Sequence, residues 1–153
     1  MTLTEVLKHT SPALFLSELQ ATDKQSALEE IVGGLIAGTP ITNRDTILQM
    51  LQSREQLGST AVGPGIAFPH GRTLAVRQLT ILIARAARGI PFDSIDGAPT
   101  HLFFVLIAPP HDSGNQYIRS LAVLTDKLQS AELREKLMAA PDYDGFCKTL
   151  QEA

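Results

Sequence analysis

One histidine of the chain, His70, has neighbours that would present its side chain rather than bury it. Pro69 stiffens the backbone before it, and Gly71 after it permits backbone angles that other residues avoid. An imidazole is mostly neutral at pH 7, so one ring nitrogen keeps a lone pair for nucleophilic attack. Upstream, Arg54 carries a guanidinium suited to clamping phosphate or carboxylate. These residue types predict a phosphohistidine site, with a hydrogen-bonded structural histidine in a Gly-rich turn as the alternative.

The segment before His70 is rich in residues that can approach an anion closely. Residues 58–71 read GSTAVGPGIAFPHG, with four glycines and two prolines, so no helix persists through them. Ser59 and Thr60 add hydroxyls that can donate to an anion, and backbone N–H groups of the loop can stabilise negative charge. The proline after Phe68 favours an extended backbone, which predicts a short strand at 66–68. We expect Phe68 to add apolar docking surface beside the histidine.

Composition excludes several classes of protein. The chain has 153 residues, 13 Lys and Arg against 16 Asp and Glu, and a formal net charge of −3, which argues against general nucleic-acid binding. Its length suits one domain over residues 1–153. The single Cys147 excludes a disulfide within the chain. The longest apolar run, residues 102–108, is far below the ~20 residues that a membrane helix needs, and residues 1–8 do not resemble a signal peptide. We expect a cytoplasmic protein with no direct membrane insertion.

Neither a metal nor a cofactor is expected. A zinc site needs closely spaced pairs of ligands, and the candidate ligands lack such spacing: they are His9, His70, His101, His111 and Cys147. The glycines at 63 and 65 do not form a dinucleotide fingerprint, because no G-x-G-x-x-G follows a strand and opens a helix.

Helices and strands are predicted to alternate along the chain. Apolar residues at helical spacing predict helices at 27–36, 43–56, 115–129, 132–138 and 143–150. Thr22 and Gln25 resemble a capping box before the first of these helices. Strands are predicted at 13–16, 66–68, 79–87 and 102–108. The last strand is apolar on both faces, which is typical of a central strand covered by helices on both sides. The pattern favours an α/β domain with a parallel or mixed sheet.

The segment that contains His70 also resembles a known family. Residues 54–71, REQLGSTAVGPGIAFPHG, look like the active-site signature of the IIA domains of the bacterial phosphotransferase system, fructose/mannitol class, and most closely of their nitrogen-regulatory member. Residues 90–97, IPFDSIDG, and the strand at 102–108 resemble the segments that follow in the family, and residues 121–140 resemble its closing helices. The likeness covers nearly the whole chain.

The resemblance implies a fold, residue roles and partners. The fold is a three-layer α/β sandwich with a mixed, mostly parallel five-stranded sheet flanked by helices. His70 is similar to the histidine that accepts a phosphoryl group from the phosphocarrier HPr or its nitrogen-branch relative. Arg54 matches the phosphate-binding arginine, and Ser59 and Thr60 match the GST loop. Sugar-transporting members pass the group to a IIB domain, whereas nitrogen-branch members act mainly by binding proteins according to their phosphorylation state.

One position departs from the family pattern. The family usually has a second histidine beside the phosphorylated one, at the start of the helix after the central strand, and here that position is Tyr117. A phenol can donate a hydrogen bond, but with a pKa near 10 it supplies no positive charge at pH 7. His111, in the loop before this helix, is a candidate substitute. Tyr117 either lines the site or packs its ring as an ordinary helix residue.

Three functions therefore stay open from the sequence. The first is a regulatory phosphocarrier that accepts a phosphoryl group on His70 as a phosphotransferase component. The second is a binding module that has kept the fold but does not turn over phosphate, for which Tyr117 is the motive. The third is a sugar-specific IIA protein that passes phosphate to a IIB domain.

Overall fold

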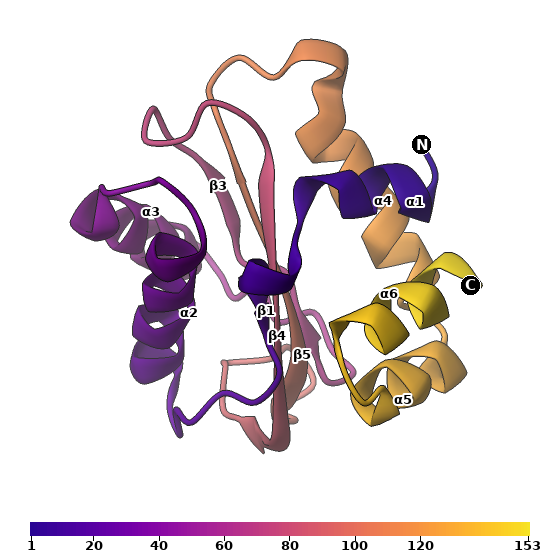
Figure 1. Cartoon of the computed structure of the whole chain (residues 1–153). Helices are drawn as coiled ribbons and strands as arrows, with labels where there is room; N and C mark the ends of the chain where they lie inside the picture. Colours follow the sequence, from indigo (N-terminus) through magenta and orange to yellow (C-terminus); the bar gives the residue numbers. More distant parts are fainter.

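Five strands form one mixed sheet through the centre of the computed structural model, which describes residues 1–153 (Figure 1). The order across the sheet is β1-β4-β5-β2, and β3 also pairs with β5. Only the β4–β5 pair is antiparallel. The strands are β1 (Phe15–Leu16), β2 (Ile66–Ala67), β3 (His70–Arg72), β4 (Thr80–Ile90) and β5 (Thr100–Ala108). The predicted fold class, a mostly parallel mixed sheet of five strands, is confirmed.

Helices cover both faces of the sheet and complete a three-layer arrangement (Figure 1). One layer consists of α2 (Lys24–Gly38) and α3 (Arg44–Gln56). The other consists of α1 (Leu3–Val6), α4 (Gln116–Lys127), α5 (Ala131–Ala139) and α6 (Tyr143–Gln151). Short 3-10 turns lie at Leu7–His9, Pro12–Leu14 and Ser113–Asn115. None of these helices combines the length and the apolarity that crossing a membrane requires.

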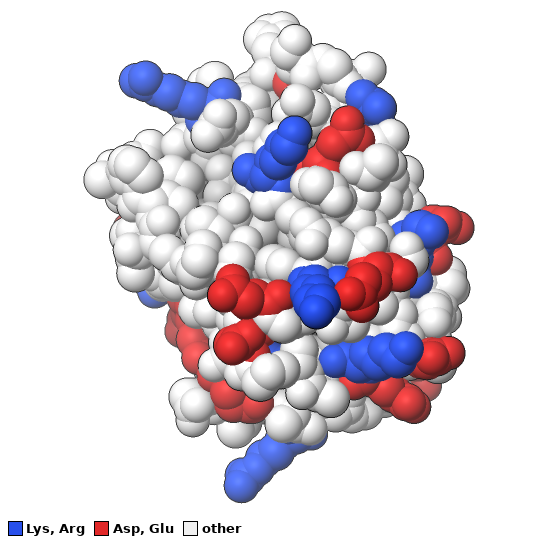
Figure 2. All heavy atoms as spheres, turned by 45° about the vertical axis from the view of Figure 1, so that its right-hand side comes forward, with Lys and Arg blue, Asp and Glu red and all other residues white.

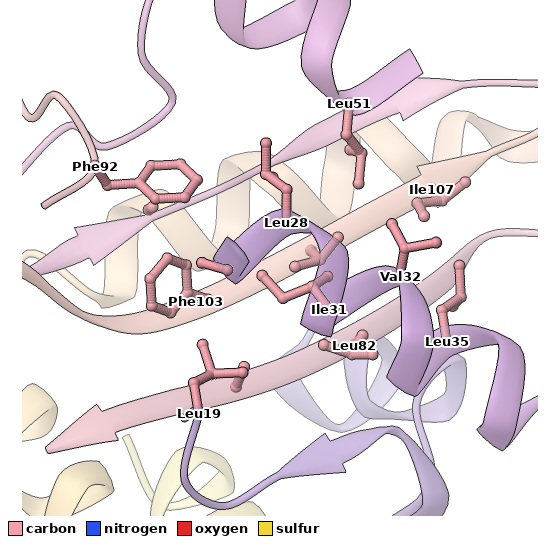
Figure 3. Close-up of a cluster of buried hydrophobic side chains, with 14 of the residues drawn as sticks. Leu19, Leu28, Ile31, Val32, Leu35, Leu51, Leu82, Phe92, Phe103 and Ile107 are labelled. Carbon is pink, nitrogen blue, oxygen red and sulfur yellow. The ribbon is translucent and has the colours of Figure 1, made fainter. Parts of the chain in front are cut away.

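The strand β5 divides the interior into two cores, because alternate side chains of a strand point to opposite faces. Phe103, Val105 and Ile107 pack with the α2–α3 layer, whereas Leu102, Phe104 and Leu106 pack with the α4–α6 layer. Figure 3 shows the first core, in which α2 directs Leu28, Ile31, Val32 and Leu35 toward the sheet. Burial on both faces explains why residues 102–108 are apolar throughout.

The structure corrects two local predictions and adds one helix that was not predicted. The helix α2 is capped by Asp23, whose carboxylate accepts a hydrogen bond from Ser26 N at 2.8 Å, so the predicted capping box of Thr22 and Gln25 is wrong. Within the predicted strand at 13–16, only the last two residues are extended, because a 3-10 turn occupies Pro12–Leu14. The helix α1 was not predicted, since its four residues are too few to display a helical period.

Charges are distributed unevenly over the surface. Figure 2 shows the face formed by the α4–α6 layer, where acidic and basic side chains alternate over the lower half. Most atoms at the upper end of this face belong to uncharged residues. A continuous basic stripe, which nucleic-acid binding would require, is absent from this face.

Candidate functional site

The register of β3 against β5 determines where the side chains around His70 point. His70 lies opposite Leu106, and Arg72 lies opposite Ala108. Both of these β5 residues belong to the core beneath α4, and side chains opposite each other on paired strands share a face. His70 and Arg72 therefore point toward α4. Gly71, between them, faces α3 instead.

The imidazole of His70 is oriented by the chain just before it. Its Nδ1 lies 2.7 Å from the carbonyl oxygen of Phe68. A carbonyl can only accept, so Nδ1 carries the hydrogen, and in the neutral ring the free lone pair is on Nε2. The Phe68 carbonyl is free for this bond because it faces the outer side of the edge strand, whereas the next carbonyl, that of Pro69, accepts from Leu106 N of β5. His70 is half-buried at the edge of the sheet.

Tyr117 lies beside the histidine at the start of α4. The centroids of the Tyr117 and His70 rings are 6.1 Å apart, and the tyrosine is only 5% exposed. Its backbone N–H donates to Asp112 Oδ2 at 2.6 Å, which secures the first turn of the helix. Burial raises the pKa of the phenol, while the positive charges of Arg72 and Arg54 act in the opposite direction. The phenol is therefore neutral at physiological pH, and both guanidinium groups lie near it.

Two arginines lie near Tyr117, and they come from different elements of the fold. Arg54 is in the last turn of α3, and its Nη1 donates to the Gly58 carbonyl at 2.8 Å. Arg72 donates from Nη1 to the Pro109 carbonyl at 3.0 Å and places Cζ 4.7 Å from the centre of the Tyr117 ring. The charges of both arginines act on Tyr117, whose ring lies beside His70. A histidine with two guanidinium groups in its surroundings is suited to accepting an anionic phosphoryl group.

The two hydroxyls of the GST loop are used within the protein. Ser59 Oγ donates to the Phe92 carbonyl at 2.6 Å, and Thr60 Oγ1 donates to Glu55 Oε2. These hydrogen bonds hold the loop in place, and in this conformation neither hydroxyl is directed to an anion beside His70. The other predicted participant, His111, is exposed in the loop after β5 and makes no hydrogen bond or ring contact with His70.

Comparison with known proteins assigns the family. The profile of the family described as phosphoenolpyruvate-dependent sugar phosphotransferase system, EIIA 2, matches residues 8–153. The chain belongs to this family. It is 34% identical to a nitrogen regulatory protein of Bradyrhizobium diazoefficiens over 92% of this chain and 90% of that protein. These similarities identify an EIIA-like phosphocarrier regulatory protein of the phosphotransferase system.

Solved structures of EIIA proteins have the same fold. The nitrogen regulatory protein IIA-Ntr of Neisseria meningitidis superposes with a TM-score of 0.86 at 26% identity, covering 95% of this chain and 99% of that one. The mannitol enzyme IIA of Escherichia coli, solved in complex with phosphorylated enzyme IIB, superposes with a TM-score of 0.76 at 20% identity. That match covers 94% of this chain and 97% of the other.

In this EIIA protein, Phe68 does not contribute to a docking surface. It is buried and stacks on Phe104 with 6.2 Å between ring centroids, so the prediction that it is exposed is wrong. Three exposed apolar side chains are instead close in sequence to polar residues of the site. Leu57, three residues after Arg54, is 86% exposed. Leu74, two residues after Arg72, is 89% exposed, and Ile118, next to Tyr117, is 53% exposed.

Sequence reasoning missed the group that anchors the GST loop. Glu55 is buried, accepts a hydrogen bond from Thr60 N at 3.1 Å, and forms an ion pair of 3.0 Å with Lys24 Nζ. Lys24 also lies 3.3 Å from Asp93 Oδ2 and 4.9 Å from the centre of the Phe92 ring. In the sequence, the only sign of this anchoring role was a carboxylate directly after Arg54, on the face of the helix that packs against the rest of the protein.

Proposed function

We propose that His70 accepts a phosphoryl group on Nε2 from an HPr-like phosphocarrier. The hydrogen bond between Nδ1 and the Phe68 carbonyl carries this proposal, because it leaves Nε2 as the nucleophilic nitrogen. In its phosphorylated and unphosphorylated forms the protein then binds different protein targets in the cytoplasm. The similarity to the nitrogen regulatory protein of Bradyrhizobium diazoefficiens supports a regulatory function, since the two proteins align along nearly their full lengths.

The transfer requires one bond to form and one to break. The Nε2 lone pair attacks the phosphorus of the donor phosphohistidine, and the donor N–P bond breaks with its electron pair returning to the donor ring. The His70 ring becomes a cation that keeps its Nδ1 hydrogen, so its hydrogen bond to Phe68 becomes charge-assisted. Arg54 stabilises the negative charge on the transferred oxygens.

The carrier docks on exposed apolar residues that are close in sequence to residues of the site. Leu57 directly follows α3, Leu74 lies in the segment after β3, and Ile118 is in α4. Isolated exposed apolar residues are common on protein surfaces, but these three each lie close in sequence to a polar residue of the site. A carrier that covers them would exclude water from the reacting histidines.

Two other functions have a specific observation in their favour. EIIA domains pair with IIB domains, as in the mannitol complex, so onward transfer to a IIB domain is the second candidate. A binding module that is never phosphorylated is the third, because the neutral Tyr117 supplies no charge to the site. Adding a IIB domain to the phosphorylated protein distinguishes the first two functions, since only a sugar-specific protein would lose its phosphoryl group to it.

The test is incubation with enzyme I, an HPr-type carrier and phosphoenolpyruvate, followed by mass measurement. One phosphoryl group on a histidine nucleophile adds about 80 Da. We expect this gain for the wild type and for His111→Gln, and no gain for His70→Gln. A wild type without the gain, or a His70→Gln variant that retains it, overturns the proposal. In the first case the binding module becomes the preferred function.

A further inference from the structure

We propose that Arg72 is a second phosphoryl-binding cation of the site, held in place by the ring of Tyr117. The inference rests on the proposed phosphorylation of His70 and adds to it the residue that balances the incoming charge. It also assigns a task to Tyr117, namely to support a guanidinium with its aromatic face rather than to carry a charge.

Geometry directs the Arg72 side chain to the same side of the sheet as the nucleophile. Arg72 follows His70 by two residues on β3, and alternate residues of a strand share a face. The guanidinium lies over the Tyr117 ring, with Cζ 4.7 Å from its centre, and the same ring is 6.1 Å from the imidazole. The tyrosine therefore contacts both side chains and sets their separation.

Two anchors restrain a side chain that would otherwise be free in solvent. The first is the aromatic face, since a guanidinium is attracted to the electron-rich face of a tyrosine ring, most strongly where water is excluded. The second is the hydrogen bond from Nη1 to the Pro109 carbonyl at 3.0 Å. Only one of the guanidinium N–H groups is used there, so the others can donate to phosphoryl oxygens.

The charge of Arg72 is not neutralised within the protein. The ion pairs of the structure involve neither Arg72 nor Arg54. The third polar group nearby, the Tyr117 phenol, stays neutral because burial raises its pKa. Two guanidinium groups without ion-pair partners near Tyr117 therefore leave an excess of positive charge next to His70, and a dianionic phosphoryl group has the opposite charge and a shape that fits a guanidinium.

The experiment uses phosphoramidate, a small phosphoryl donor that needs no protein carrier. His70 Nε2 attacks its phosphorus, the N–P bond of the donor breaks, and ammonia leaves with the electron pair. The rate of mass gain is measured for each variant, together with its melting temperature. We expect Arg72→Gln to react about 10–100-fold more slowly, the scale for loss of one preorganised charge-stabilising donor at a partly exposed site. Arg77→Gln, which removes an exposed arginine after β3, is the matched control and should react as the wild type does.

Three variants separate the supporting role of the ring from other roles. Tyr117→Phe keeps the aromatic face and should stay within about 3-fold of the wild type, whereas Tyr117→Ala should be as slow as Arg72→Gln. The double variant Arg72→Gln/Tyr117→Ala should be no slower than either single variant, because both remove the same interaction. Arg72→Lys keeps the charge without the planar fork and should recover part of the rate.

The outcomes distinguish this inference from the proposed function. A wild type that phosphoramidate modifies at His70, but that an HPr-type carrier does not, overturns the proposed carrier reaction and leaves the Arg72 comparison valid. Arg72→Gln reacting within 2-fold of the wild type overturns the inference, as do additive losses in the double variant. Failure of both donors to modify the wild type at His70 overturns both, and if only the carrier modifies it, the same variants are compared in the carrier reaction.

Discussion

Met50 of α3 lies so close to Gly71 of β3 that a Cβ on the glycine would overlap the methionine sulfur. The helix therefore packs directly on the backbone of the strand that carries His70. Arg54 is four residues beyond Met50, one helical turn away on the same side of α3. The missing side chain at Gly71 thus leaves room for Met50, one turn before Arg54, to pack on the strand of His70.

Gly71→Ala should displace the Met50 side chain, weaken folding and, because Gly71 adjoins His70, slow phosphorylation. Inserting a methyl group into a filled contact costs about 1–3 kcal/mol, and we expect the lower end because the atom it meets belongs to a flexible methionine side chain. Gly33→Ala is the control, because nothing lies within 4 Å of its Cβ position in α2, and it should stabilise the helix by about 0.5–1 kcal/mol. Denaturant unfolding and the phosphorylation rate check both expectations. Equal unfolding free energies for Gly71→Ala and the wild type would contradict the close contact.

Glu55→Gln should loosen the GST loop without removing any residue that faces His70. The amide cannot accept from both Thr60 groups and also neutralise Lys24, so we expect a loss of about 1–3 kcal/mol in unfolding free energy. For a protein of this size that corresponds to a melting temperature lower by roughly 2–4 °C per kcal/mol. Glu29→Gln, an exposed change on α2, should leave the melting temperature unchanged. Equal melting temperatures for the two variants would exclude an anchoring role of Glu55.

Asp112→Ala should lower stability and slow phosphoryl transfer, whereas Asp142→Ala, a similar change at another helix, should lower stability alone. Asp112 accepts from Tyr117 N at 2.6 Å, and Asp142 accepts from Gly145 N at 2.8 Å at the start of α6. Losing either cap costs about 1 kcal/mol of unfolding free energy. Only Asp112→Ala frees the first turn that carries Tyr117, so only this variant should slow phosphoryl transfer. The prediction fails if Asp142→Ala slows the reaction equally.

His9 should make the protein less stable in acid. Burial lowers the pKa of this imidazole below its ordinary value of 6.5, and the nearby charge of Asp112 opposes the shift only partly. Below about pH 6.5 the unfolded chain binds a proton more readily than the folded one, so stability falls as the pH drops. His9→Gln removes this contribution. Unfolding free energies measured between pH 7.5 and 5.5 should decline more steeply for the wild type, and parallel profiles would contradict the prediction.

Leu74→Glu should weaken docking of the carrier while leaving the histidine itself reactive. The side chain is 89% exposed, so the change should not affect folding. We expect a slower reaction with the HPr-type carrier at low carrier concentration, and an unchanged reaction with phosphoramidate. Ala131→Glu, at the exposed start of α5, is the control and should alter neither rate. An equal effect of both variants on the carrier reaction would point to net charge rather than to a docking surface.

The central, doubly covered strand and the placement of His70 were within reach of the sequence because both depend on local patterns. The alternation along residues 102–108 separates two cores, and the Pro-His-Gly triplet leaves few positions for the imidazole other than the surface. The resemblance to the EIIA family supplied the mixed five-stranded sheet, whereas the order of its strands was not predicted.

Contacts between distant segments could not be predicted. Lys24 and Glu55 belong to different helices, and nothing in either helix indicates that they meet beneath the GST loop. The stacking of Arg72 on Tyr117 likewise depends on how α4 follows the loop after β5. Phe68 was assigned to the docking surface because it adjoins His70. It lies two residues earlier on the same face of the sheet, where its ring is covered and packs on Phe104 in the core.

The interruption of the edge strand at Pro69 has a consequence for solubility. An exposed strand edge offers unpaired N–H and C=O groups to a strand of another molecule, and natural proteins block such edges with prolines, charged side chains and short strands. Here β2 and β3 have two and three residues, Pro69 separates them, and Arg72 ends the second. The features that orient the nucleophile thus also protect the protein against edge-to-edge aggregation.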